Sequence, residues 1–284
     1  MEPTLIDIND WRLSGGGAQG DSYIDKATGN YLLKMFHANQ ARYSIEDEVT
    51  RSLNVYEAGI PSPEPGRFVT DGEHFGAIFK LIKNKSSFCT AISKNPDCLE
   101  DIATRFAKMT RDLHSAKVNR DKFEPATVLY RNLLNINTTM DADMKAACDR
   151  ILTGMESSKA EPSYVHGDLH FGNVITDGVK DYFIDLGQFS YGDPLIDDSM
   201  NYFICKLTQE HMIQYLYHVD HATGLKFWDV FEKSYFDKPL ASDDAYMDLY
   251  APYLLLRTLI FEREIGNDEY NKAYRKMFMD RIAK

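Results

Sequence analysis

The chain has 284 residues and a formal charge of −11 at pH 7, and 44% of its residues are hydrophobic and 26% charged. This balance is typical of a folded globular protein and excludes a chain that is disordered throughout. The negative charge argues against nucleic acid and anionic membranes as partners.

The first third of the chain predicts a small antiparallel sheet with one helix. A glycine-rich run at residues 15–20 and a turn at residues 26–30 separate short stretches with the alternation of strands. One helical stretch follows at residues 41–58 and ends at Gly59 and Pro61. The five predicted strands are residues 10–13, 22–25, 31–36, 66–70 and 75–82.

Beyond residue 84 the pattern becomes mainly helical, with apolar residues at helical spacing. This change predicts two lobes, residues 1–84 and 85–284, and an α+β fold class. The helices are expected at residues 99–116, 126–135, 141–155 and through most of the chain after Pro194, with short strands at 164–165, 174–176 and 182–185.

Neither a membrane span nor a signal peptide is predicted. No run of about 18 apolar residues occurs, and the first residues lack the basic and apolar segments of a secretion signal. We therefore expect a cytoplasmic protein that does not bind membranes. The four cysteines are scattered without a CxxC pair, which argues against a zinc site and a disulfide framework.

The densest group of chemically active side chains lies between residues 165 and 185. Asp168 and Asn173 stand in Val-His-Gly-Asp-Leu-His-Phe-Gly-Asn-Val, and Asp185 follows twelve residues after Asn173. Phosphoryl transfer needs a carboxylate to orient the attacking hydroxyl and oxygen ligands to hold Mg²⁺. Asp168 fits the first task, and Asn173 and Asp185 fit the second. The alternation of His166, Asp168 and His170 leaves a metal-dependent hydrolase as an alternative.

A GxGxxG pattern is formed by Gly15, Gly17 and Gly20, and this pattern occurs in dinucleotide-binding folds and in kinases. A dinucleotide site needs a helix directly after the glycines, whereas residues 22–36 alternate and turn like a hairpin. The pattern therefore favours a loop over ATP phosphates, with a nicotinamide-dependent oxidoreductase as an alternative. Lys34 lies in the apolar strand that follows, where it either points to solvent or faces the phosphates.

The stretch around Asp168 resembles the His-Gly-Asp-x-His-x-x-Asn signature of the aminoglycoside phosphotransferase and choline kinase superfamily, which is itself similar to the protein-kinase catalytic loop. The resemblance implies a bilobal, protein-kinase-like fold and the cofactors ATP and Mg²⁺. It implies that Asp168 is the catalytic carboxylate and that Asn173 and Asp185 bind the metal. It further implies that Lys34 pairs with the nucleotide phosphates and with Glu48 on the following helix.

This resemblance extends over about the first 200 residues but departs from the family at the connection between the lobes. Lys80 and Asn84 stand where relatives commonly have an acidic residue and a glycine, which leaves the choice between ATP and GTP open. In the same comparison His166 and His170 are expected to support the loop backbone.

The acceptor is expected to be a small hydroxylated molecule. Most of the negative charge lies after residue 160, which suits a cationic substrate such as an aminoglycoside or a choline-like metabolite. A protein-hydroxyl kinase is a weaker alternative, because the segment between Asp185 and Pro194 is too short for a long activation loop. A catalytically silent nucleotide-binding module is a further alternative.

Overall fold

The computed structural model describes residues 2–16, 20–38 and 42–283. The chain falls into two compact units, the first made of the residues up to Phe88 together with Asn173–Phe189. The second contains Cys89–Gly172 and the residues from Ser190 onward. The predicted α+β class is confirmed, while the predicted lobe boundary at residue 84 stays a prediction.

The first unit is built on a six-stranded sheet with the strand order β1-β5-β6-β4-β3-β2. Its strands are β1 Thr4–Leu5, β2 Trp11–Gly16, β3 Gly20–Asp25, β4 Tyr31–Phe36, β5 Pro65–Thr70 and β6 Phe75–Lys80. The five predicted strands are present. The prediction missed β1, which pairs in parallel with β5 and is too short, at two residues, to show a strand's alternation.

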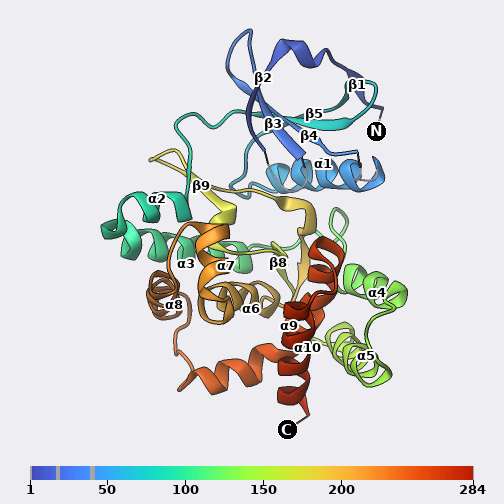
Figure 1. Cartoon of the computed structure of the whole chain (residues 1–284), viewed down its shortest axis with the longest axis vertical. Coiled ribbons are helices and arrows are strands. Elements are labelled where there is room, and N and C mark those ends of the chain that lie inside the picture. Colours follow the sequence, from blue (N-terminus) through green and yellow to red (C-terminus); the bar gives the residue numbers. More distant parts are fainter. Residues whose placement is uncertain (1, 17–19, 39–41, 284) are drawn as a thin grey trace. The chain divides into compact units, whose positions relative to one another are not determined.

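Helix α1, Arg42–Glu57, lies along one side of this sheet (Figure 1). Its buried Ile45 and Val49 pack with Phe36 of β4 and with Phe68 and Ala77 of the neighbouring strands. Burial of each such large apolar side chain contributes about 1.5–3 kcal/mol. Because side chains alternate along a strand, Lys34 shares the α1 side of β4 with Phe36.

A second, three-stranded sheet of the first unit has the order β10-β9-β7. Its strands are β7 Ser86–Ser87, β9 Val174–Thr176 and β10 Asp181–Phe183. In the β9–β10 hairpin, Asp177 Oδ1 accepts the N–H groups of Val179 and Lys180. Gly178 has a φ of +92°, a conformation that costs glycine little. The hairpin is antiparallel, so the residues just before β9 and just after β10 lie side by side.

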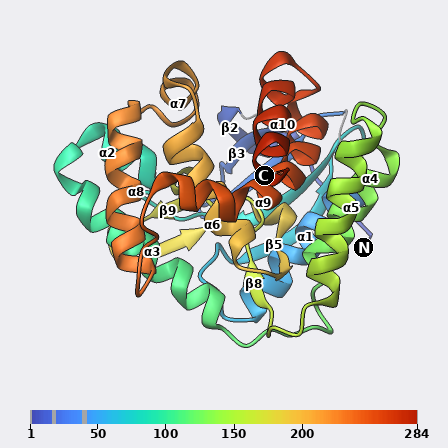
Figure 2. The same cartoon turned by 90° about the horizontal axis from the view of Figure 1, so that it is seen from below.

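The second unit is mainly helical, as predicted. Figure 2 shows α3 and α8 side by side, and α9 packs against α10. The helices are α2 Phe88–Lys94, whose first residue belongs to the first unit, α3 Leu99–Ser115, α4 Ala126–Ile136, α5 Ala142–Ser157, α6 Leu195–Tyr202, α7 Glu210–Tyr217, α8 His221–Tyr235, α9 Asp243–Ile265 and α10 Glu269–Ile282. Two short strands, β8 Ser163–Val165 and β11 Ser190–Gly192, pair with each other.

Aromatic side chains form much of the core between α3 and α8. The Phe106 ring lies 5.5 Å from that of Phe227 and 5.6 Å from that of Phe231. Such pairs contribute about 0.5–1.5 kcal/mol each beyond the burial of their area. Within the described part of the chain, no helix is both long enough and apolar enough to cross a membrane.

Candidate functional site

Lys34 forms an ion pair with a carboxylate of helix α1. Its Nζ lies 2.7 Å from Glu48 Oε1 and 3.5 Å from Asp185 Oδ1, and the Lys34 and Glu48 side chains are only 18% and 15% exposed. Burial acts to lower the Lys34 pKa, but the charges of Glu48 and Asp185 raise it more, so the ammonium stays protonated. The first unit therefore holds a fixed positive charge beside two carboxylates.

Asp185 follows strand β10 and has left-handed backbone geometry, with a φ of 57°. The sequence placed Asp185 inside a strand, but β10 ends at Phe183 and the chain turns at Asp185 into a short 3₁₀ helix, Leu186–Gln188. Arg51 of α1 donates a hydrogen bond to the Gly187 carbonyl of this turn. The Asp185 side chain is 56% exposed, so its oxygens can accept a ligand.

Asn173 comes directly before β9, on the hairpin that also carries Asp185. The Ile184 N–H donates to the Asn173 carbonyl oxygen over 3.0 Å, which ties the two ends of the hairpin together. One amide and one carboxylate therefore sit on adjacent chain segments. Among the described residues, no group of three or more His, Cys, Asp and Glu side chains has the arrangement of a metal site.

Two of the three loop glycines can be assessed. Gly20 begins β3, and a Cβ at this position would lie 2.2 Å from the Met35 carbonyl oxygen, so the sheet itself requires glycine there. Among the described residues, no atom lies within 4 Å of the position that a Cβ of Gly15, in β2, would take. Gly17 lies outside the described residues. Close packing against β4 explains why residue 20 is glycine. Packing against the described residues does not explain why residue 15 is glycine.

Asp168 belongs to the second unit, in the loop after β8. Asp197 of α6 fixes this loop, because its two carboxylate oxygens accept the N–H groups of His166 and Gly167 over 2.7 and 2.8 Å. His114 of α3 holds Asp197 in turn, with Nε2 3.1 Å from Oδ2. Gly167 has a φ of +83°, which a side chain would disfavour. Residues of helices α6 and α3 thus set the backbone that presents Asp168.

The side chain of Asp168 lies against Arg257 of α9, a contact that the sequence did not predict. Arg257 Nη2 lies 2.6 Å from Asp168 Oδ1, and Nη1 donates to the Gly167 carbonyl over 2.6 Å. A detectable signal existed, because Arg257 is the one charged residue in a mainly apolar run at residues 253–261. A charge inside an apolar helix is rarely buried without a partner.

His166 and His170 contact the backbone of the same loop. The His166 ring Nδ1 accepts the Asp168 N–H over 3.3 Å, and the His170 ring Nδ1 accepts the Gly172 N–H over 3.0 Å. His170 Nε2 is 3.8 Å from Asp168 Oδ2. These contacts fit the supporting role expected for both histidines.

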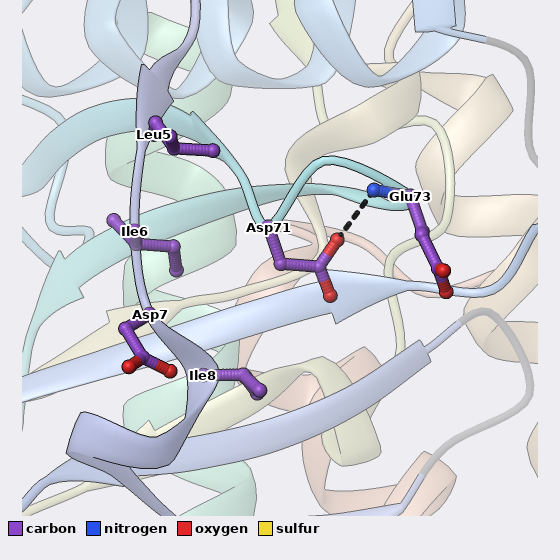
Figure 3. Close-up of a pocket in the computed structure, with 6 residues that line it drawn as sticks. All are labelled: Leu5, Ile6, Asp7, Ile8, Asp71 and Glu73. Atoms are coloured by element: carbon purple, nitrogen blue, oxygen red, sulfur yellow. Dashed lines mark hydrogen bonds between the residues drawn. The ribbon is translucent and has the colours of Figure 1, made fainter.

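A separate pocket of about 340 Å³ opens in the first unit between β1 and the turn that joins β5 to β6 (Figure 3). Its polar lining comes from Asp7, Asp71 and Glu73, and the Glu73 N–H donates to Asp71 Oδ1 over 2.9 Å. None of the predicted site residues lines this pocket.

The model of the phosphotransferase enzyme family matches residues 10–228, which is more than half of the chain. The chain therefore belongs to this family. A search of curated proteins found no match. All of the predicted site residues fall within the matched span, whereas Arg257 lies beyond it.

Solved structures of small-molecule kinases are similar to the whole chain. Amicoumacin kinase hAmiN, in complex with AMP-PNP, Ca²⁺ and Ami, is 16% identical, with a TM-score of 0.61 over 99% of this chain and 91% of that one. Choline kinase LicA from Streptococcus pneumoniae is 17% identical, with a TM-score of 0.55 over 99% and 94%. Aminoglycoside phosphotransferase APH(3'')-Id from Streptomyces rimosus is 18% identical, with a TM-score of 0.57 over 88% and 92%. The expected fold, that of aminoglycoside and choline kinases, is confirmed.

Proposed function

We propose that this protein is an ATP-dependent phosphotransferase that moves the γ-phosphate of ATP to a hydroxyl of a small molecule. The observation that carries the proposal is the Lys34 ammonium, which is held 2.7 Å from Glu48 and 3.5 Å from Asp185. A protonated lysine fixed in this way is suited to pair with nucleotide phosphates, whose charge must be neutralised during transfer.

The other proposed site residues of the first unit also serve to hold the nucleotide phosphates and neutralise their charge. Gly15, Gly17 and Gly20 cover the phosphates, and Glu48 orients Lys34 toward them. Asn173 and Asp185 would hold Mg²⁺, since one carboxylate and one amide suit an ion that keeps several waters and also binds substrate phosphates. When bound, the metal would neutralise charge on the transferred phosphoryl group.

Asp168 is the proposed catalytic carboxylate. It orients the acceptor hydroxyl and accepts its proton as the new oxygen–phosphorus bond forms and the bond between the γ-phosphorus and the bridging oxygen breaks. ADP leaves with the electron pair of the broken bond. The Asp197 carboxylate supports this role indirectly, because it holds the loop backbone on which Asp168 stands.

The proposed acceptor is a cationic small molecule with a free hydroxyl. The similar structures are named as kinases of amicoumacin, choline and aminoglycosides. An excess of acidic residues after residue 160 would favour such a cation electrostatically. We also propose that the protein is cytoplasmic and binds neither nucleic acid nor membranes.

A mass-spectrometric screen tests this function. The protein is incubated with Mg·ATP and each member of a panel of aminoglycosides, choline, ethanolamine, amino alcohols and sugars, and every acceptor is examined for the mass of one added phosphate. One phosphorylated acceptor is expected, and its product should vanish with the Asp168→Asn variant. Stabilisation by Mg·ATP without any phosphorylated acceptor would favour a silent nucleotide-binding module.

A further inference from the structure

The candidate catalytic carboxylate forms an ion pair with a residue of helix α9. One guanidinium, that of Arg257, donates to two successive residues: to the Asp168 carboxylate and to the Gly167 carbonyl, each over 2.6 Å. The planar fork of an arginine fixes both acceptors relative to each other. The Asp168 side chain is therefore held in one orientation on its own backbone.

This ion pair is largely shielded from solvent. The Arg257 side chain is 5% exposed, and that of Asp168 is 24% exposed. Burial acts to lower the Arg257 pKa, but the charges of Asp168 and Glu264 and the nearby tyrosines together raise it more, so the guanidinium stays protonated. Truncation of one partner in such a pair leaves the other charge buried without compensation.

The other described titratable groups near Asp168 include a histidine, two tyrosines and a glutamate. His170 lies 3.8 Å from the other carboxylate oxygen. Burial raises the pKa values of Tyr130, Tyr217 and Glu264, and the charge of Asp168 raises them further. These three groups are neutral or acidic, so none of them favours ionised Asp168.

Helix α10 fixes the part of α9 that carries Arg257. Asn271 Nδ2 donates to the Thr258 carbonyl over 3.3 Å, and Arg275 Nε donates to Thr258 Oγ1 over 3.2 Å. The Arg257 guanidinium also lies 5.2 Å from the centre of the Phe261 ring. Helix α10 thus holds the backbone next to Arg257, and Phe261 of α9 lies beside the guanidinium itself.

From these contacts we propose that Arg257 is a positioning residue that keeps Asp168 ionised and oriented for the acceptor hydroxyl. The proposal rests on the proposed function, in which Asp168 must be a carboxylate before it accepts the hydroxyl proton. An opposite charge at hydrogen-bond distance favours the ionised form of a carboxylic acid. Through Arg257, helix α9 would therefore help to set the pH range in which the enzyme is active.

Carboxyl-carbon NMR tests the ionisation directly and needs no turnover. In protein labelled at aspartate with ¹³C, the Asp168 resonance is assigned as the one that Asp168→Asn removes. Arg257→Met should shift the titration midpoint of this carboxyl upward by about 1–3 pH units. Arg257→Lys, which keeps the charge, should reverse most of the shift.

Arg131→Met provides the control. Arg131 lies on α4 of the second unit, and its partly buried side chain, 26% exposed, pairs with Glu156 over 2.8 Å. Both methionine variants lose an arginine–carboxylate ion pair, but only Arg257→Met should move the Asp168 midpoint. An unchanged midpoint in folded Arg257→Met, or an equal shift in Arg131→Met, would overturn the proposal.

The pH dependence of turnover gives a second readout. With an acceptor from the screen, or with water as the acceptor when ADP release is followed, Arg257→Met should lower kcat about tenfold at pH 7. It should also move the acidic limb of the kcat profile upward while the KM for Mg·ATP changes little. A wild-type protein without any turnover would contradict the proposed function, while the NMR titration would still decide the role of Arg257.

Discussion

Two buried or partly buried cations of the described residues each pair with a proposed site carboxylate. Lys34 with Glu48 and Arg257 with Asp168 each place a cation within 2.7 Å of a carboxylate. A single buried charge would cost several kcal/mol, so each partner is needed to keep the other ionised. Substitution of one partner therefore acts on both.

Asp198, on helix α6, is the contrasting case of a buried carboxyl group with an unsatisfied oxygen. Its Oδ1 has no hydrogen-bond partner among the described residues. Burial raises the Asp198 pKa to about 7, although the nearby His114 acts to lower it. Burial also acts to lower the His114 pKa, but the hydrogen bond to Asp197 and the nearby acidic charges raise it more.

This raised pKa predicts that stability falls as pH rises. The folded state binds a proton on Asp198 more tightly than the unfolded state, so the stabilisation is complete below about pH 4 and is lost between about pH 4 and pH 7. The raised His114 pKa acts in the same direction. Asp198→Asn should flatten the dependence and stabilise the protein at pH 8 by about 1–4 kcal/mol. Urea unfolding at several pH values measures this, and an unchanged slope would contradict it.

At the scale of elements, the β2–β3 hairpin contains one glycine that close packing requires and one that is proposed to cover the nucleotide phosphates. Gly20→Ala should cost roughly 1–3 kcal/mol, because its Cβ would collide with the β4 backbone at Met35. Gly15→Ala should leave stability nearly unchanged, since no atom of the described residues lies within 4 Å of its Cβ position, but it should weaken Mg·ATP binding if Gly15 covers the phosphates. Thermal unfolding and calorimetric Kd values measure both effects. Unchanged affinity in Gly15→Ala would remove Gly15 from the proposed phosphate loop.

The β9–β10 hairpin carries the two proposed metal ligands and gives a prediction of its own. Asp185→Asn should weaken nucleotide binding in the presence of Mg²⁺ by about tenfold, or 1.4 kcal/mol. Binding in EDTA should change much less, because the carboxylate acts through the metal. Asp181→Asn, on strand β10 of the same hairpin, is the control and should leave both affinities unchanged. Equal losses with and without Mg²⁺ would argue against a metal-ligating role for Asp185.

The sequence was most informative where local patterns decide the structure. The β4 prediction, residues 31–36, agrees with the observed strand, and α3, α4 and α5 lie within two residues of their predicted bounds. The two-residue β1 was missed because its pairing with β5 depends on distant residues. Strand β11 was missed for the same reason, since it forms only against β8.

At the candidate site, too, contacts between residues distant in the sequence were harder to predict than local patterns. The pairing of Lys34 with Glu48 was expected from the resemblance, and the two side chains lie 2.7 Å apart. Arg257 was missed, because it follows Asp168 by 89 residues and no local pattern links them. An apolar helical run indicates a buried helix, but it does not tell which loop an arginine in that helix will contact.

The proposed nucleotide-binding residues and the proposed catalytic carboxylate lie in separate compact units of the chain. Lys34, Glu48, Asn173 and Asp185 belong to the first unit, and Asp168 belongs to the second. Membership of the phosphotransferase enzyme family relates both units to one chemistry, since the family match at residues 10–228 spans all five residues. Substitution of these residues in the first unit should therefore weaken nucleotide binding, whereas substitution of Asp168 in the second unit should lower turnover.

The Asp168→Asn variant tests most directly whether Asp168 is the catalytic carboxylate of a phosphotransferase. Its kcat for phosphate transfer and its Kd for Mg·ATP are measured beside those of the wild type. We expect kcat to fall by about 10²–10⁴-fold while the Kd stays nearly unchanged, because Asp168 acts on the acceptor hydroxyl. Retained turnover, or loss of nucleotide binding together with turnover, would contradict it.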